Sequence, residues 1–262
     1  MFKPFLLLSS LSFTYAIIGS LYADEYSLRK YTHVKSFYET LTPLVIEMSN
    51  KHKLPAASIL AVAGLESGYG TGYVSQITGN VLSLGAFKGD KELPGLYLPY
   101  SKGLKRILFD PREIRKRPKK DLFFKKRAKS LKRDYRPYRY AGTKHHLELL
   151  KYNELLRTKA HKACLNDFAT RWITLNSKIK VFKNARRWLN RQVYLKKEKI
   201  LDSMSLNIAF INKIGGVSHS FNHRRSWPKK VNFIMKRTGL IALVNDIKYK
   251  NMSFEEAWEN KK

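Results

Sequence analysis

A single carboxylate followed by a run of glycines is the feature of this chain that most suggests chemistry. The sequence from Ala61 to Gly72 is AVAGLESGYGTG, and Glu66 falls at the last turn of an apolar helix of small residues. At the end of a buried helix, loss of water raises the pKa of a carboxyl group, as a general acid for glycosidic cleavage requires. The glycines that follow tolerate tight, positive-φ turns and leave space for an extended ligand. An exposed glutamate near a helix C-terminus is the alternative.

Three tyrosines follow Glu66 at positions where their rings would flank a glycan cleft and stack on sugars; they are Tyr69, Tyr73 and Tyr100. Ordinary packing is the alternative for each. The histidines form no HExxH motif or comparable set of metal ligands. His145–His146 and His219–His223 are therefore interpreted as solvated loop residues, and we expect no metal and no cofactor.

The elements that must position Glu66 follow from apolar periodicity. Residues 36–53 predict an amphipathic helix, and Pro55 suits the first turn of an alanine-rich helix over 56–66. Further helices are predicted over 147–156, 161–175, 181–189 and 207–214. The last marked helix begins at Ser226-Trp227-Pro228, with Ser226 as N-cap, and ends near Gly239.

The region between these helices has a different composition. Residues 68–100 hold much of the glycine and several turn signals, which predicts loops and one or two short strands forming a lobe over the site. Residues 112–140 are a basic insertion with interleaved aromatic residues, of which 121–132 favour a helix with a solvated basic face. The density of the run indicates contact with an anionic polymer. We expect an α+β fold, mostly α, with a small Gly-rich irregular or β lobe.

The net charge and the N-terminal sequence limit the kinds of partner and the cellular locations that are possible for this protein. The chain has 262 residues and a formal net charge of +31, which implies a polyanionic partner or surface. A basic start, an apolar stretch over 5–18 and small residues up to Ala23 predict a signal peptide over 1–23, and an N-terminal membrane anchor is the alternative. We therefore expect an exported protein, periplasmic or at the cell envelope or outside, with no nucleic-acid partner and no membrane span after cleavage of the signal.

Cys164 is the only cysteine, so no intrachain disulfide is possible. It lies among apolar residues on a helical pattern, which predicts a buried thiol and not a nucleophile.

Three segments together carry a resemblance. The first is Ala61 to Gly70 with its Glu-Ser-x-x-Gly element, and the second is Gly79 to Gly89 (GNVLSLGAFKG). The third is Phe221 to Val231 (FNHRRSWPKKV). This set resembles the bacterial glucosaminidase family, the peptidoglycan-cleaving endo-β-N-acetylglucosaminidases of autolysins and flagellar wall hydrolases. Members show A-x-x-E-S-x-x-G, then N-N-L-F-G-x-K-G, and later Y-A-T-D-x-x-Y-A-x-K-[LV].

The resemblance implies a lysozyme-like domain over 36–240, after a polar lead-in at 24–35 and before a C-terminal extension at 241–262. It implies hydrolysis of β-1,4 bonds after N-acetylglucosamine in peptidoglycan glycan strands, with Glu66 as the acid. It also places Tyr69, Tyr73, Asn80 and Phe221 at the substrate, and anionic envelope polymers would attract the cationic chain. Two departures stand out: the tyrosine thought to line the reacting centre is Phe221, and Arg224 occupies the place of an acid.

A second group must position or activate water, unless the N-acetyl group of the substrate assists. The resemblance implies a second acidic residue from the lobe after the glycine-rich stretch. Spacing does not select one, and each candidate is equally a surface acid; they are Asp90, Glu92, Asp110, Glu113, Glu148 and Glu154.

Three other functions are compatible with the chain. A lytic transglycosylase also uses a helix-end Glu-Ser but continues into G-x-M-Q, which is absent after Glu66. A non-catalytic wall-binding protein on a degenerate hydrolase fold would explain Phe221 and the unassigned second carboxylate. A secreted cationic protein that binds nucleic acid or lipid rests on charge alone.

Overall fold

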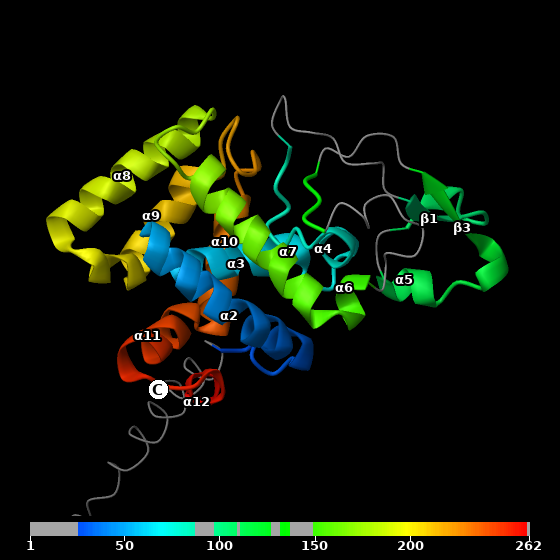
Figure 1. Cartoon of the computed structure of the whole chain (residues 1–262), viewed down its shortest axis with the longest axis horizontal. Coiled ribbons are helices and arrows are strands. Elements are labelled where there is room, and N and C mark those ends of the chain that lie inside the picture. The colour runs from blue at the N-terminus through cyan, green and yellow to red at the C-terminus, as the bar shows by residue number, and fades with distance from the viewer. Residues whose placement is uncertain (1–25, 87–96, 109–110, 127–131, 137–148, 261–262) are drawn as a thin grey trace, which may run out of the picture.

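The alanine-rich segment after Pro55 forms the central helix of the fold. The computed structural model describes residues 26–86, 97–108, 111–126, 132–136 and 149–260, and in it this helix is α3 (Ala56–Ser67). All residues from Ala56 to Gly64 are buried, because apolar side chains lie on every side of the helix. Around it pack α2 (Thr32–His52), α9 (Met204–Ile214), α10 (Trp227–Thr238) and α11 (Leu240–Lys250) (Figure 1). The helix predicted over 56–66 is confirmed, with Pro55 at its N-cap and not in its first turn.

Helix α2 confirms the amphipathic helix predicted over 36–53. It begins earlier, at Thr32, so the segment expected as a polar lead-in already contains its first turn. Its buried face repeats at helical spacing and packs on α3; it includes Val34, Phe37, Tyr38, Leu41, Val45 and Met48. Close packing is possible because α3 carries small residues: a Cβ at Gly64 would lie 2.4 Å from the Tyr38 hydroxyl oxygen.

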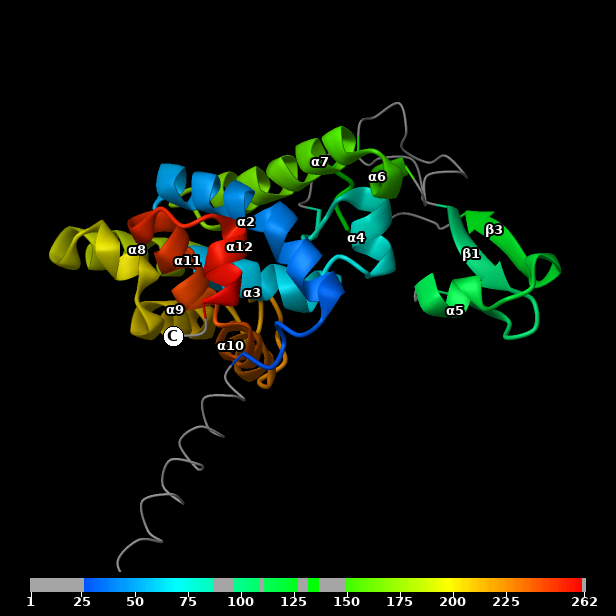
Figure 2. The ribbon, with the colours of Figure 1, turned by 90° about the horizontal axis from the view of Figure 1, so that it is seen from below.

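A three-stranded antiparallel sheet lies at one end of the molecule, away from the helical core in both views (Figures 1 and 2). Its order is β2 (Arg106–Ile107), β1 (Tyr97–Ser101), β3 (Leu122–Lys126), with Tyr100 opposite both Ile107 and Phe123. Two short helices accompany it, α5 (Pro111–Arg115) and the 3-10 turn η1 (Lys119–Asp121). The helix predicted within 121–132 was therefore wrong, because the aromatic residues of Leu122–Lys126 pair with β1 across the sheet. Helix α4 (Tyr73–Thr78) was not expected in the glycine-rich region.

The later helices follow the predicted pattern with shifted ends. One helix was expected over 147–156. The structure instead has two helices, α6 (Leu149–Tyr152) and α7 (Glu154–Asp167), which are separated at Asn153. The Asn153 side chain accepts a hydrogen bond from the Leu156 N–H, which makes it the N-cap of α7. Three elements follow α7: the π-helical turn η3 (Phe168–Trp172), the helix α8 (Lys180–Lys196) and the 3-10 turn η4 (Glu198–Asp202). Helix α10 confirms the predicted start at Trp227 and end at Gly239, although the Ser226 side chain makes no capping bond.

The last 22 residues, expected as a C-terminal extension, contribute α11 and α12 (Phe254–Glu259) to the main core. Leu243, Val244, Ala257 and Trp258 are buried there with residues of α2 and α3. Within the described part, which is mostly helix with one small sheet, the expected α+β, mostly α class is confirmed. The predicted signal peptide lies outside the described residues. None of the described helices is long and apolar enough to cross a bilayer.

Candidate active site

The turn after α3 determines where the Glu66 carboxyl group lies. Gly68, Tyr69 and Gly70 all have positive φ, and the Ser67 hydroxyl donates to the Ala63 carbonyl at 2.6 Å and accepts from the Gly70 N–H at 2.9 Å. A Cβ at Gly72 would lie 2.7 Å from the Ser67 carbonyl oxygen, so only glycine allows the chain to return so closely. The turn leaves Glu66 half-buried on the last turn of α3.

The carboxylate of Glu66 accepts a hydrogen bond from Trp227, the first residue of α10. The indole Nε1 lies 2.8 Å from Glu66 Oε1, and Trp227 is only 3% exposed. Its ring stacks on Phe221 with centroids 5.3 Å apart and an angle of 27°. A Cβ at Gly215 would lie 2.1 Å from the indole, so the ring lies directly against the backbone there. Phe221 and Gly215 thus hold the indole in the orientation that donates to Glu66.

Burial raises the pKa of Glu66, while the hydrogen bond from Trp227 and the charge of Lys132 act against that rise. The net direction is upward, so Glu66 holds its proton to a higher pH than an exposed glutamate. Lys132 belongs to the segment 132–136; its Nζ donates to the Ser83 carbonyl at 2.6 Å, and its backbone pairs with Gly85. The prediction of a desolvated carboxyl group with a raised pKa is confirmed.

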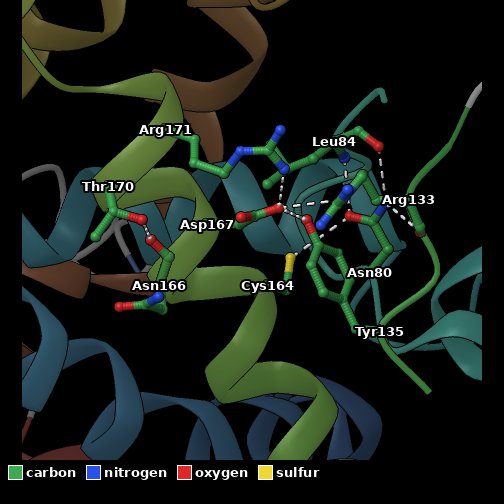
Figure 3. A network of polar contacts seen from close by, with 9 residues as sticks. All are labelled: Asn80, Leu84, Arg133, Tyr135, Cys164, Asn166, Asp167, Thr170 and Arg171. Carbon is green, nitrogen blue, oxygen red and sulfur yellow. Dashed lines mark hydrogen bonds and ion pairs between the residues drawn. The ribbon is translucent and has the colours of Figure 1, made fainter. Parts of the chain in front are cut away.

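A polar network fixes the segment that carries Lys132 (Figure 3). Asp167 at the end of α7 accepts from the Tyr135 hydroxyl at 2.9 Å and pairs with Arg133 at 3.2 Å and Arg171 at 3.4 Å. These contacts join residues 132–136 to α7. Because Asp167 has three partners within the protein, we assign it to holding this segment and not to the chemistry.

Asn80 is part of the same network and is 1% exposed. Its amide nitrogen donates to the carbonyls of Leu84 and Arg133 at 2.9 and 3.0 Å, and its oxygen accepts from the Leu84 N–H at 2.8 Å (Figure 3). The Cys164 thiol lies 3.5 Å from the same oxygen. Asn80 was predicted to bind substrate, but its amide is used to join two backbone segments. Cys164 is fully buried, which confirms the predicted buried thiol, and burial raises its pKa to about 12.

The other predicted residues lie in different places. Phe221 is half-buried beside Trp227, and Tyr69 is half-buried in the turn, edge-on to Phe37 and Tyr38. Burial raises the pKa of Tyr69 to about 12. The side chain of Tyr73 lies outside the described residues. Tyr100 belongs to β1 and packs on Phe123 with centroids 5.0 Å apart, so it is part of the sheet.

No second carboxylate is seen to act on Glu66 within the described ranges, where the charged group that influences it is Lys132. Of the six candidates, Glu113 pairs with Arg106, and Glu154 is exposed in the first turn of α7. Asp90, Glu92, Asp110 and Glu148 lie outside the described residues. The part of the chain that the structure describes also holds no group of three or more His, Cys, Asp or Glu side chains able to bind a metal ion.

Sequence reasoning missed Trp227 and Lys132 as members of the site. Trp227 was identified only as the start of a helix, and Lys132 only as one of many cations. The glycine pair Gly215-Gly216 was a usable signal, because adjacent glycines often mark a place where another group approaches the backbone. Trp227 and Pro228 are the groups that approach them.

Replacing Trp227 by Phe is expected to raise the pKa of Glu66 further. The substitution keeps an aromatic ring beside Phe221 but removes the N–H that stabilises the ionised carboxylate. The midpoint of the Glu66 titration, followed by NMR of its isotope-labelled carboxyl carbon, should therefore move to higher pH. Trp188→Phe on α8, whose ring lies against Lys213, is the matched control. An unchanged or acid-shifted midpoint in Trp227→Phe would show that this hydrogen bond does not lower the pKa of Glu66.

No protein-family model, curated protein or solved structure matches this chain.

Proposed function

We propose that this protein cleaves β-1,4 glycosidic bonds of peptidoglycan, with Glu66 as general acid on a lysozyme-like scaffold. The observation that carries the proposal is the half-buried Glu66 carboxyl group with its raised pKa, held by Trp227 through one oxygen. No described residue bonds to the other oxygen, Oε2. Cleavage requires a proton on the leaving oxygen as an oxocarbenium-like centre forms, and a desolvated carboxylic acid is suited to deliver it.

The surroundings of Glu66 support a sugar ligand. Phe221 and Tyr69 are half-buried aromatic residues that both follow Glu66 in the chain. Phe221 stacks on Trp227, and Tyr69 lies in the turn after α3. Partly exposed rings offer flat apolar faces next to a proton donor. With hydrolysis as the reaction, water would attack the anomeric carbon after N-acetylglucosamine, and either a second carboxylate or the substrate's N-acetyl group would assist.

The isolation of Glu66 among the described residues favours a second candidate. Hydrolysis with a carboxylate pair places the two carboxyl groups within about 5–9.5 Å of one another. Lys132, and not a carboxylate, is the charged neighbour found for Glu66. A lytic transglycosylase uses one such acid, because a hydroxyl of the sugar itself attacks and leaves an anhydro ring. This reaction is the alternative reading of the same site.

Product analysis distinguishes the two reactions. Purified peptidoglycan digested with the protein should yield fragments ending in reducing N-acetylglucosamine, as detected by mass spectrometry after borohydride reduction. Fragments ending in anhydro-muramic acid would show that the reaction is transglycosylation and not hydrolysis, with Glu66 as the acid in either case. Release of neither product, with a folded protein, would reject glycan cleavage and leave a wall-binding protein on this fold.

The charge of the chain supports an envelope partner for this activity. A net charge of +31 would steer the protein to anionic wall polymers, and screening should weaken that attraction as salt rises above physiological strength. Export remains part of the proposal, since it depends on residues 1–23.

A further inference from the structure

A cavity of about 320 Å³ lies between α2, α4, α6, α7 and the turn after α3. These elements lie next to one another at the end of the helical body nearest the sheet (Figures 1 and 2). Glu66 is not among the described residues that line the cavity. The described residues of its lining include Phe37, Tyr69, Leu150, Lys151, Arg157 and His161.

His161 on α7 is the unusual member of this lining. It is 8% exposed, yet neither ring nitrogen has a hydrogen-bond partner in the described part of the chain; Nδ1 is fully buried, so Nε2 is the nitrogen that a molecule in the cavity can reach. Polar side chains this far buried usually have a hydrogen-bond partner in the protein, in a ligand or in an ordered water. Burial, with the nearby charge of Arg157, lowers the pKa of His161 to about 4. At neutral pH the imidazole is uncharged, with one N–H to donate.

The described residues of the lining carry charge of one sign. Arg157 and Lys151 contribute cations, and no carboxylate stands among the described lining residues. Arg157 Nη1 donates to the carbonyls of Leu150 and Lys151 at 3.2 and 3.0 Å, which fixes the guanidinium at the junction of α6 and α7. A fixed guanidinium binds a carboxylate well, because its donors match the two oxygens.

The remaining walls are mainly apolar. Phe37 is 8% exposed and meets Tyr69 at right angles, with centroids 6.2 Å apart, and Leu150 is 1% exposed. Hydroxyl groups of Ser36, Thr40, Thr71 and Ser75 stand among them. A volume of this size, apolar with a few polar groups, is typical of small-molecule sites.

We propose that this cavity binds a small monocarboxylate with a flat apolar body. The carboxylate pairs with Arg157 and Lys151, the body lies against Phe37, Tyr69 and Leu150, and His161 supplies the hydrogen bond that it makes to nothing else in the described protein. This site goes beyond the proposed glycan cleavage and does not depend on it. Tyr69, three residues after Glu66, belongs to its wall.

The test uses para-fluorobenzoate as the probe, followed by fluorine NMR on the full folded chain at physiological salt. The wild-type protein should bind it saturably, and para-fluorobenzamide, which has the same ring without the charge, should bind at least about tenfold more weakly. His161→Gln and Arg157→Gln should each weaken binding by about tenfold or more. Lys159→Gln removes an equal charge from an exposed position of α7 outside the cavity and should leave the affinity unchanged.

A second pair of variants tests the site even if His161→Gln or Arg157→Gln fails to fold. Thr40 is half-exposed on α2, so Thr40→Trp should fill the cavity without disturbing the core and abolish binding, whereas Thr40→Ala should retain it. Binding that is non-saturable, equal for the amide, or unchanged in Thr40→Trp overturns the proposal. Loss of wall cleavage in Glu66→Gln with intact probe binding would show that the two sites are separate, and neither result depends on the other.

Discussion

Glu66→Gln should lower kcat/KM for peptidoglycan cleavage by about a hundredfold to ten-thousandfold, the range typical of losing a general acid. This is about 3–5 kcal/mol of transition-state stabilisation. The amide keeps the shape of the side chain and can still accept the Trp227 N–H at Oε1, but it has no proton to deliver to the leaving oxygen. Release of soluble fragments from purified wall, measured at several substrate concentrations, gives the ratio.

The raised pKa of Glu66 also predicts the direction in which Glu66→Gln changes the stability of the fold. Burial holds the pKa of Glu66 above its usual value of 4.5, so the folded state favours the protonated acid. Stability from that preference is fully present below the unfolded pKa and is lost as the pH rises through the folded pKa. At neutral pH the ionised group is therefore unfavourable, and Glu66→Gln should unfold at the same temperature as wild type or higher. The difference should narrow towards acid pH.

Glu39→Gln on the exposed face of α2 is the control for both measurements and should change neither. If Glu66→Gln cleaves the wall as fast as wild type, or if both are inactive while folded, Glu66 has no part in proton transfer. A large drop in the melting temperature of Glu66→Gln would instead mean that the carboxylate is a structural group.

Arg29→Ala should destabilise the fold by about 3 kcal/mol or more, which for a chain of this size lowers the melting temperature by roughly 6–12 °C. The guanidinium is 6% exposed and donates to five carbonyls: those of Thr238 at 2.8 Å, Ala257 at 3.1 Å, Gly239 and Asn260 at 3.2 Å, and Trp258. These lie at the C-terminal ends of α10 and α12, where helix carbonyls lack partners and the dipole favours a cation. Removing the guanidinium takes a buried donor away from both helix ends, although the Gly239 carbonyl still accepts from the Leu243 N–H at 3.0 Å.

Aromatic rings enclose the same guanidinium. Its Cζ lies 4.5 Å from the Tyr26 ring centroid and 5.0 Å from that of Trp258. Burial lowers the pKa of Arg29, but an arginine with an ordinary value near 12.5 stays charged. Arg29→Lys should recover only part of the loss, because one ammonium group cannot reach the carbonyls of two helix ends at once.

Lys30→Ala is the matched control, since Lys30 is the exposed neighbour whose ammonium group, among the described residues, meets only the Tyr31 ring, at 5.2 Å. Denaturant unfolding of the three variants measures the order of stability, which should be Lys30→Ala equal to wild type, then Arg29→Lys, then Arg29→Ala. Equal stability of Arg29→Ala and wild type would contradict the role of Arg29 in joining the segment before α2 to the C-terminal ends of α10 and α12.

Local signals in the sequence determined a large part of this architecture. The Ala-rich run after Pro55 predicted α3, and Pro228 with Gly239 predicted both ends of α10. Helical periodicity and the residues at helix ends depend on a few neighbouring positions, so a helix can be predicted from them without the rest of the chain. There were two exceptions. Asn153 is a local signal that was not recognised as an N-cap. The strand over 122–126 was missed because its partner lies more than 20 residues earlier in the chain.

The candidate site divides in the same way. The sequence determined by itself that Glu66 ends a buried helix at a glycine turn, because burial of α3 and the positive φ at Gly68 both follow from neighbouring residues. Only the tertiary structure decided that Trp227, 161 residues away, donates to that carboxylate, that Asn80 faces inward, and that Arg29 joins helix ends more than 200 residues distant. These contacts depend on how whole helices pack, and a missing Cβ at Gly215 has a meaning only once the Trp227 ring lies against it.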